Sequence, residues 1–200
     1  MFLSGDDPEL LVGNFMGDFV KGPLGNAYPP RIRQGLMLHR KIDSFAQKDA
    51  CFQASRLRLS ATYGLYRGVL VDLFYDHFLA TEWHLWSDRE FPEYLAWARN
   101  CIELHRGVMP QKLQGLIPVI FDELLPSYCS IAGIGSALTR MSRRITRPNA
   151  LSGGEAELIR HYGELKFEFD SFTRNAQQFV AGFISKGGQG SGFPDGHEEG

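Results

Sequence analysis

Aspartate and histidine side chains recur at helical spacing inside otherwise apolar stripes of this sequence. Residues three or four apart share a helix face, and such faces carry Leu11 in one segment, Leu36 in a second and Val69 in a third. The polar groups that continue these faces are Asp18 in the first segment, His39 and Asp43 in the second, and Asp72 and Asp76, with His77 beside them, in the third. The spacing predicts that three helices direct carboxylates, and two of them also histidines, toward the interior.

Several carboxylates at interior positions require cations, because burying an unpaired carboxylate is very costly. The three stripes contain no Lys or Arg, so a divalent metal held by His and Asp on facing helices would resolve the conflict. Two other interpretations remain open. Each group could be a hydrogen-bonded core histidine or a lateral aspartate that pairs with Arg40 or Arg67. Alternatively, Arg31, Arg40 and Lys41 could turn inward and form a buried ion-pair network.

A second feature is a run rich in arginine and free of acidic residues. Residues 124–154 contain no Asp, Glu or Lys. Within this run, Arg140, Arg143 and Arg144 fall within about one helical turn. A positive helix of this kind could steer an acidic partner toward the protein, or could be an ordinary solvated face. Near His39, the basic residues include Arg40, which could hold a phosphate.

The composition predicts an all-α chain in which helices position these groups. Leu occurs 23 times, whereas Val, Ile and Thr total 7, 10 and 5, and strand-rich proteins favour β-branched residues. Start and stop signals predict helices over residues 8–22, 30–48, 51–59, 62–86, 91–106, 111–125 (kinked at Pro118), 133–147 and 152–184. We expect one domain, a helical bundle over residues 1–185, followed by a Gly-rich tail over 186–200 that is disordered by composition.

Length and charge limit the function classes. The chain has 200 residues and a formal net charge of −2, which leaves no overall basic signature for nucleic-acid binding. Its longest uncharged run is too short to span a membrane. Three widely spaced cysteines favour a reducing cytoplasm over a disulfide framework. We therefore expect a cytoplasmic protein with no nucleic-acid or membrane partner.

Four segments resemble the bacterial acyl carrier protein phosphodiesterases. They are residues 13–22, 35–45, 72–80 and 138–144, and they include His-Arg-x-Ile-Asp at 39–43 and Tyr-Asp-His-Phe-Leu at 75–79. The similarity runs in order from about residue 2 to residue 183. Family members usually begin earlier, with a segment like Asn-Phe-Leu-Ala-His, and Phe2-Leu3-Ser4 matches only the end of that region. By this resemblance a further metal-binding histidine would fall just before Met1, so either the start codon is misassigned or this protein lacks one ligand.

The resemblance implies an all-α fold, distantly similar to HD-type phosphohydrolases, and an activity. The family hydrolyses the phosphodiester that joins 4′-phosphopantetheine to a serine of holo-acyl carrier protein, with Mn²⁺ as the usual metal. The roles expected here are metal ligation by His39, Asp72, Asp76 and His77, catalysis by Asp18, Asp43 and Asp76, and substrate binding by Arg40, Arg140, Arg143 and Arg144. Two other functions stay open, namely hydrolysis of a small nucleotide by an HD-type enzyme and non-catalytic binding of acidic proteins.

Overall fold

The computed structural model describes residues 1–187, and this part of the chain is helical and contains no strand. The expected all-α fold is confirmed. The helices are α1 (Pro8–Met16), α2 (Pro30–Ala46), α3 (Ala50–Arg58), α4 (Arg67–Thr81), α5 (Phe91–Leu104), α6 (Gln111–Gln114), α7 (Leu125–Ser127), α8 (Ile131–Arg144), α9 (Glu155–Arg160) and α10 (Tyr162–Gly187). Short 3₁₀ turns are η1 (Phe2–Ser4), η2 (Gly17–Phe19), η3 (Ala61–Tyr66), η4 (Trp83–Leu85) and η5 (Arg106–Val108), and η6 (Val119–Leu124) is a π-helical segment.

Three of the expected long helices are interrupted, and the helix expected over 8–22 already ends at Met16. The helix expected over 62–86 is wrong at both ends, because Gly64 adopts a positive φ of 49° and Glu82 leaves the helical region, so α4 covers only Arg67–Thr81. The helix expected over 152–184 breaks at His161, whose φ of −117° and ψ of 24° separate α9 from α10. The helix expected over 111–125 is interrupted after α6, and Pro118, where a kink was expected, has helical angles directly before the π-helical segment η6.

The chain's last described helix passes the expected end of the folded domain. Helix α10 continues to Gly187, two residues beyond the boundary predicted at 185. The rest of the Gly-rich segment, 188–200, lies outside the described residues. Within residues 1–187, no helix combines the length and apolar character needed to cross a membrane.

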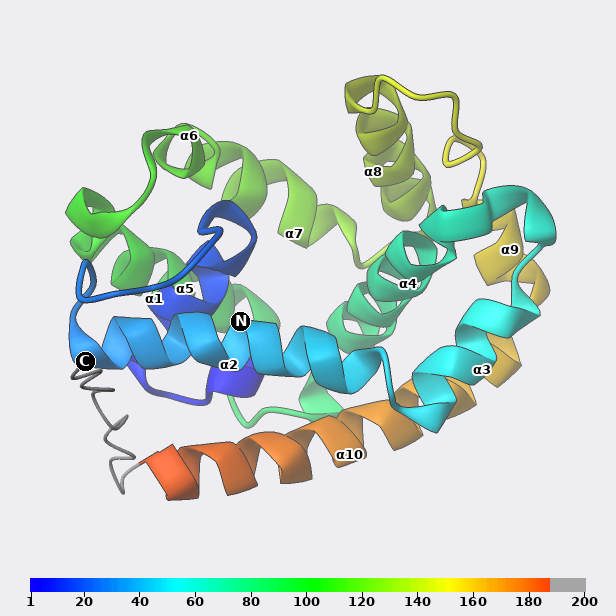
Figure 1. Cartoon of the computed structure of the whole chain (residues 1–200). Helices are drawn as coiled ribbons and strands as arrows, with labels where there is room; N and C mark the ends of the chain where they lie inside the picture. The colour runs from blue at the N-terminus through cyan, green and yellow to red at the C-terminus, as the bar shows by residue number, and fades with distance from the viewer. Residues whose placement is uncertain (188–200) are drawn as a thin grey trace, which may run out of the picture.

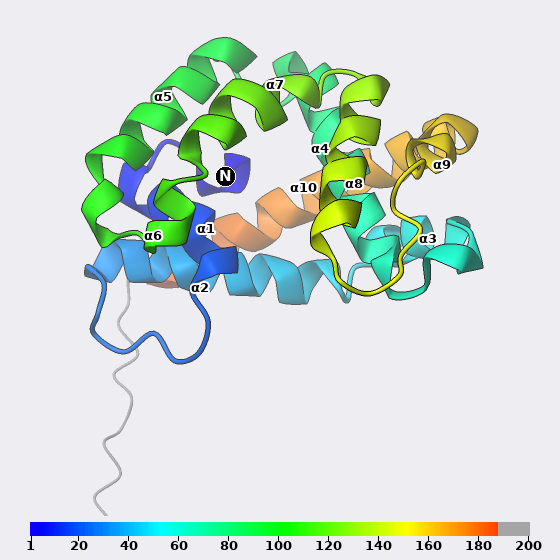
Figure 2. The same cartoon turned by 90° about the horizontal axis from the view of Figure 1, so that it is seen from above.

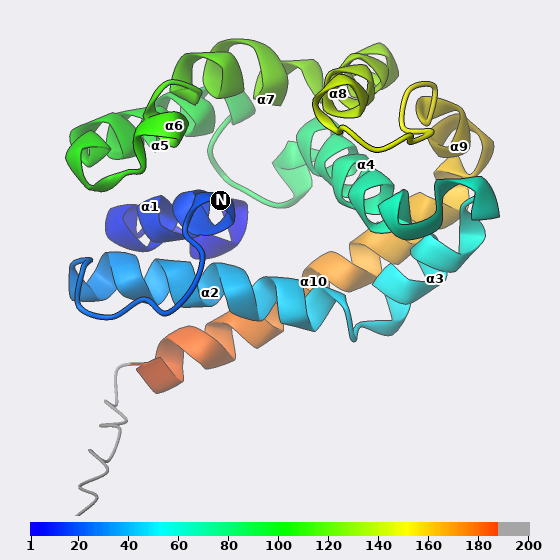
Figure 3. The ribbon, with the colours of Figure 1, turned by 45° about the horizontal axis from the view of Figure 1, so that its top comes forward.

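Helices α1 and α2 pack closely because glycines face each other at their contact. A Cβ built on Gly13 would lie 2.0 Å from the carbonyl oxygen of Ile32, and one built on Gly35 would lie 2.3 Å from that of Leu10. Helix α1 lies between α2 and α5 (Figure 3), and α10 contacts α3 and α4 in its first half before it runs beside α2 (Figure 1). The same arrangement seen from above places α4 and α8 at the opposite end of the molecule from α5 and α6 (Figure 2).

Two apolar cores hold the two ends of the molecule. One joins α4, α8 and α10 and includes Leu70, Phe74, Phe78, Leu138, Leu158, Leu165 and Phe169. The other joins α1, α2 and α5 and includes Leu11, Val12, Met16, Ile32, Leu36, Ala98 and Ile102. A small third cluster, Leu10, Leu38 and Val180, connects α1, α2 and α10. Each core fixes one helix that carries candidate site residues, α2 on one side and α4 on the other.

Candidate active site

His39 of α2 lies between two carboxylates. Its Nε2 atom is 3.6 Å from an Asp18 oxygen and 3.4 Å from an Asp43 oxygen. Asp43 follows His39 by one turn of α2, and Asp18 comes from η2, which directly follows α1. Gly17 makes this possible, because a Cβ there would lie 2.0 Å from Cγ of His39, so the ring sits against the glycine backbone.

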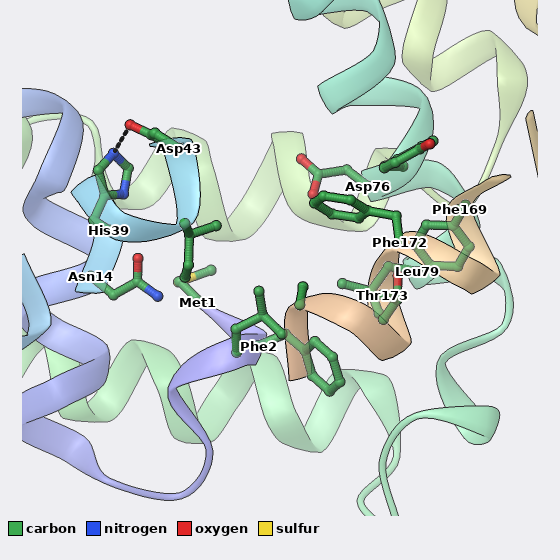
Figure 4. Close-up of a pocket in the computed structure, with 14 residues that line it drawn as sticks. Met1, Phe2, Asn14, His39, Asp43, Asp76, Leu79, Phe169, Phe172 and Thr173 are labelled. Carbon is green, nitrogen blue, oxygen red and sulfur yellow. Dashed lines mark ion pairs between the residues drawn. The ribbon is translucent and has the colours of Figure 1, made fainter. Parts of the chain in front are cut away.

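These groups open into two neighbouring hollows. The first, which we call the carboxylate cleft, has a volume of about 830 Å³ and is lined by Asp18, His39, Asp43, Ala46, Gln47, Phe52, Gln53, Arg56, Leu65, Gly68, Val69 and Asp72. The second, which we call the inner pocket, has a volume of about 250 Å³ and is mainly apolar, with Asp76 on its wall. His39 and Asp43 line both, and Figure 4 shows them across the inner pocket from Asp76. The two α4 carboxylates thus face adjoining spaces at the same centre.

The carboxylates are not buried in the core, as the apolar stripes had predicted. The side chains of Asp18 and Asp43 keep 77% and 59% of their surface exposed, and Asp72 and Asp76 also reach solvent. The apolar residues of each stripe pack against neighbouring helices. The aspartates that continue the stripes lie at the edge of the two hollows, where the helix face is exposed to solvent. The prediction of interior carboxylates is therefore wrong, although the prediction that one region gathers them holds for Asp18, His39, Asp43 and Asp72.

Clustering and poor hydration shift the pKa values of the acidic groups at this site. The Asp18 carboxylate raises the pKa of His39 against the effect of burial, and the charge of Asp43 adds to the increase. His39 in turn lowers the pKa of Asp18. Loss of hydration raises the pKa of Asp72 to about 7, with the charges of Asp76, Asp43 and Asp18 adding to it. Although Asp76 reaches solvent, the protein around it restricts hydration and raises its pKa to about 6.

His77 points away from this centre. Its Nδ1 lies 2.7 Å from the carbonyl oxygen of Tyr128, and its Nε2 lies 3.3 Å from the hydroxyl of Tyr162. A carbonyl can only accept, so Nδ1 donates and Nε2 accepts, and burial lowers the pKa of His77. The structure does not bring this histidine to the carboxylates, because neighbouring residues of a helix point about 100° apart.

The predicted basic residues occupy three different settings. Arg40 donates to the carbonyl oxygens of Val20 and Gly22, at 3.2 and 2.7 Å, and so fixes the loop after η2. Arg140 pairs with Glu123 at 2.7 Å on the exposed face of α8, where Arg143 and Arg144 are also exposed. Helix α8 packs against α4, which carries Asp72 and Asp76.

The alternative of a buried ion-pair network lacks its cations. Arg31 pairs with Asp7 at 2.7 Å, Lys41 is exposed, and Arg40 bonds to backbone carbonyls as described. None of the three turns toward the cluster. The basic side chain that does line the carboxylate cleft is Arg56 of α3, which the stripe pattern missed. Its signal in the sequence is weak, and consists of its position one turn after the buried Phe52.

The donor types of the centre suit a divalent metal such as Mn²⁺, which accepts imidazole and carboxylate ligands. Two ligands of one ion lie about 3 to 3.5 Å apart, close to the distances from His39 Nε2 to the Asp18 and Asp43 oxygens. Within residues 1–187, however, no three His, Cys, Asp or Glu side chains already converge on one point at which an ion could sit. The residues therefore fit a metal in kind, and side-chain rotation is needed to complete a ligand set.

Comparison with known proteins identifies the family. The profile of the acyl carrier protein phosphodiesterase family matches residues 1–176. The chain belongs to the acyl carrier protein phosphodiesterase family. It is 31% identical over 170 residues to the acyl carrier protein phosphodiesterase of Serratia proteamaculans, which covers 84% of this chain and 88% of that one.

Other members of the family show similar likeness. The Yersinia pestis acyl carrier protein phosphodiesterase is 31% identical over 164 residues, covering 81% of this chain and 85% of that one. The Escherichia coli one is 28% identical over 164 residues, with the same coverage. No solved structure matches the chain. The expected membership is confirmed, and the likeness to HD-type phosphohydrolases stays a prediction.

Proposed function

We propose that this chain hydrolyses the phosphodiester between 4′-phosphopantetheine and the serine of holo-acyl carrier protein in a metal-dependent reaction. The observation that carries the proposal is the carboxylate cleft, in which family-typical segments from η2, α2 and α4 bring Asp18, His39, Asp43 and Asp72 around one solvent-filled space. The names of the relatives support acyl carrier protein as the substrate, and the residues of the cleft support a metal-dependent hydrolysis.

The residues have two proposed roles, metal binding and proton acceptance, and Asp76 is a candidate for both. His39, Asp72 and Asp76 are the proposed metal ligands, and His77 is omitted because both its nitrogens already bond to protein. When bound, a divalent ion would lower the pKa of a water ligand and neutralise charge on the phosphoryl oxygens. Asp18 and Asp43 both lie beside Nε2 of His39, and they would be further ligands of the same ion or would orient the His39 ring.

One of the carboxylates Asp18, Asp43 and Asp76 accepts the proton of the attacking water. The water oxygen bonds to phosphorus, and the bond from phosphorus to the serine oxygen breaks. The serine oxygen leaves with a proton, which gives apo-acyl carrier protein and 4′-phosphopantetheine. His39 lowers the pKa of Asp18, which makes Asp18 a weaker base than an ordinary aspartate. The pKa of Asp76, raised to about 6, lies closer to the value that favours a general base near neutral pH.

Arg140, Arg143 and Arg144 are the proposed docking surface for the carrier protein, which is small and acidic. An exposed positive helix would speed the encounter and orient the partner more than it would add to affinity. Its packing against α4 links this surface to the helix that carries two of the site carboxylates.

The direct test follows the mass of the carrier protein. Purified protein is mixed with Mn²⁺ and holo-acyl carrier protein, and mass spectrometry should record loss of the phosphopantetheine mass, which EDTA should prevent. Asp76→Ala should abolish the reaction without unfolding the chain. Asp122→Ala, which removes an exposed surface carboxylate paired with Arg99, is the matched control and should remain active.

Two results would overturn the proposal. Hydrolysis of free nucleotides without any loss of phosphopantetheine would favour a nucleotide hydrolase. Binding of carrier protein that EDTA leaves unchanged, without product, would favour a non-catalytic module.

A further inference from the structure

Arg56 occupies an unusual position among the arginines of this chain. It projects from α3 into the carboxylate cleft, which also contains Asp18, His39, Asp43 and Asp72. Its Nη1 makes one long hydrogen bond of 3.3 Å, to Gln53 on its own helix. Its Nε is buried and has no hydrogen-bond partner among residues 1–187. The guanidinium group is therefore held in the cleft but is not saturated by protein contacts.

The neighbouring arginine of α3 differs from Arg56 in being ion-paired. Arg58, two residues further along the helix, pairs with Glu168 and Glu164, although its Nε also lacks a hydrogen-bond partner among residues 1–187. Within the described part of the chain, Arg56 has no carboxylate within ion-pair distance, although it is close enough to Asp72 to oppose the rise in that residue's pKa. An arginine that lines an acidic cleft without forming an ion pair retains its charge and its donors for a ligand.

Arg56 also lies close to the start of α4. A Cβ built on Gly68 of α4 would lie 3.9 Å from Nε, and glycine leaves that space open. The one hydrogen bond of the guanidinium group, to Gln53, holds it on its own helix. A guanidinium group that is already held in this way loses less conformational entropy when it binds an anion.

We propose that Arg56 binds a non-bridging oxygen of the phosphodiester, an inference that rests on the proposed function. The substrate is an anion that must enter a space lined by three carboxylates, and a cation on the cleft wall offsets that repulsion. Arginine suits the role because its planar donors match two oxygens of a phosphate. The negative charge on these oxygens persists through the reaction, so Arg56 orients the substrate and stabilises the transition state.

The test compares two substrates. Holo-acyl carrier protein and bis(p-nitrophenyl) phosphate share a phosphodiester but not a protein surface. Arg56→Ala should lower kcat/KM by about a hundredfold for both, the loss typical of one donor to a reacting oxyanion. Arg56→Lys keeps the charge and loses the paired donors, so its loss should be about tenfold.

A second readout measures binding of an anion rather than the rate of the chemical step. Inorganic phosphate should inhibit the wild-type enzyme competitively, and Arg56→Ala should raise its inhibition constant about tenfold. Arg106→Ala is the matched control, because it removes an arginine that pairs with Glu103 on the surface and lines neither hollow. It should change both rates by less than about twofold. Thermal unfolding checks that each variant is folded.

Each outcome decides the question. A loss confined to holo-acyl carrier protein would make Arg56 a docking residue and overturn the proposal, and so would unchanged rates and phosphate inhibition. If Arg56→Ala does not fold, an Arg56→Lys variant with wild-type stability and wild-type kinetics would also overturn it. A wild-type enzyme that cleaves bis(p-nitrophenyl) phosphate but not holo-acyl carrier protein would refute the proposed substrate and leave the role of Arg56 testable on the small diester.

Discussion

Replacing Gly35 with alanine should destabilise the protein, although the same change in a helix interior usually has the opposite effect. Alanine is normally the better helix former by about 0.5 to 1 kcal/mol. At Gly35, however, the new Cβ would lie 2.3 Å from the carbonyl oxygen of Leu10 and 2.8 Å from Cα of Gly13. Both are backbone atoms of α1, so no side chain can rotate away and the helices must separate.

The expected loss follows from these contacts. Inserting one methyl group into a closely packed contact costs about 1 to 3 kcal/mol, and the helix propensity of alanine recovers part of it. We expect a net decrease of about 1 kcal/mol in the free energy of unfolding, which in a chain of this size is about 2 to 4 °C in Tm. Because His39 lies one turn beyond Gly35 on α2, separation from α1 should also weaken its contact with Asp18.

The assay is urea unfolding followed by circular dichroism, with Gly182→Ala as the control. Gly182 lies in α10, and a Cβ there would meet nothing within 4 Å. Gly182→Ala should therefore stabilise the protein by about 0.5 to 1 kcal/mol. Equal stabilisation by both substitutions would refute the reasoning, because it would mean that α1 and α2 do not approach as closely as their glycines indicate.

Three further predictions concern charge and buried polar groups. In metal-free protein, the raised pKa of Asp72 means that the folded state holds its proton more tightly than the unfolded state, where the value is near 3.8. The contribution of Asp72 to the stability of the folded state should thus be greatest below pH 4 and should be lost as the pH rises through about 7. In thermal unfolding scans, Asp72→Asn should make Tm depend less on pH over this range. Ser55→Ala should cost about 1 to 3 kcal/mol in denaturant unfolding, because the fully buried Ser55 donates to Glu168 at 2.6 Å. Charge reversal of Arg143 and Arg144 should raise KM for holo-acyl carrier protein about tenfold and leave hydrolysis of bis(p-nitrophenyl) phosphate unchanged; a loss for both substrates would contradict the docking assignment.

Local signals in the sequence predicted most of the helix boundaries. Asp7, directly before Pro8, caps α1 and accepts the N–H of Leu10 at 2.8 Å. Some helices were predicted too long. The actual helix ends at positions where the apolar spacing of side chains continues but the backbone leaves the helical conformation. Gly64 permits a positive φ that no spacing of apolar residues reveals. His161 interrupts a continuous apolar stripe, so periodicity alone extended α10 backwards into α9.

Part of the candidate site could be predicted from the sequence, because helical spacing places His39 and Asp43 on one helix face regardless of tertiary structure. What spacing could not reveal is whether that face meets another helix or a hollow. It placed His77 with Asp76 because they are adjacent in sequence, yet the histidine turns to Tyr128 and Tyr162. Arg56 reaches the cleft from α3 through tertiary packing alone, with no pattern linking it to the acids.

The carboxylates of the cleft would be an unfavourable arrangement if they served the fold alone. Asp72 is opposed by the charges of three other aspartates, and only Arg56 lowers its pKa. Replacing Asp72 by a neutral residue should relieve this repulsion, so the stability of the fold gives no reason for a carboxylate at this position. A bound cation would reverse the balance, because each carboxylate would then interact favourably with a positive charge at the centre. Stabilisation of the folded protein by Mn²⁺ should therefore be strongest above pH 7, where Asp72 is ionised, and should be lost in Asp76→Ala. A metal-independent Tm across this pH range would show that the acids cluster without binding an ion.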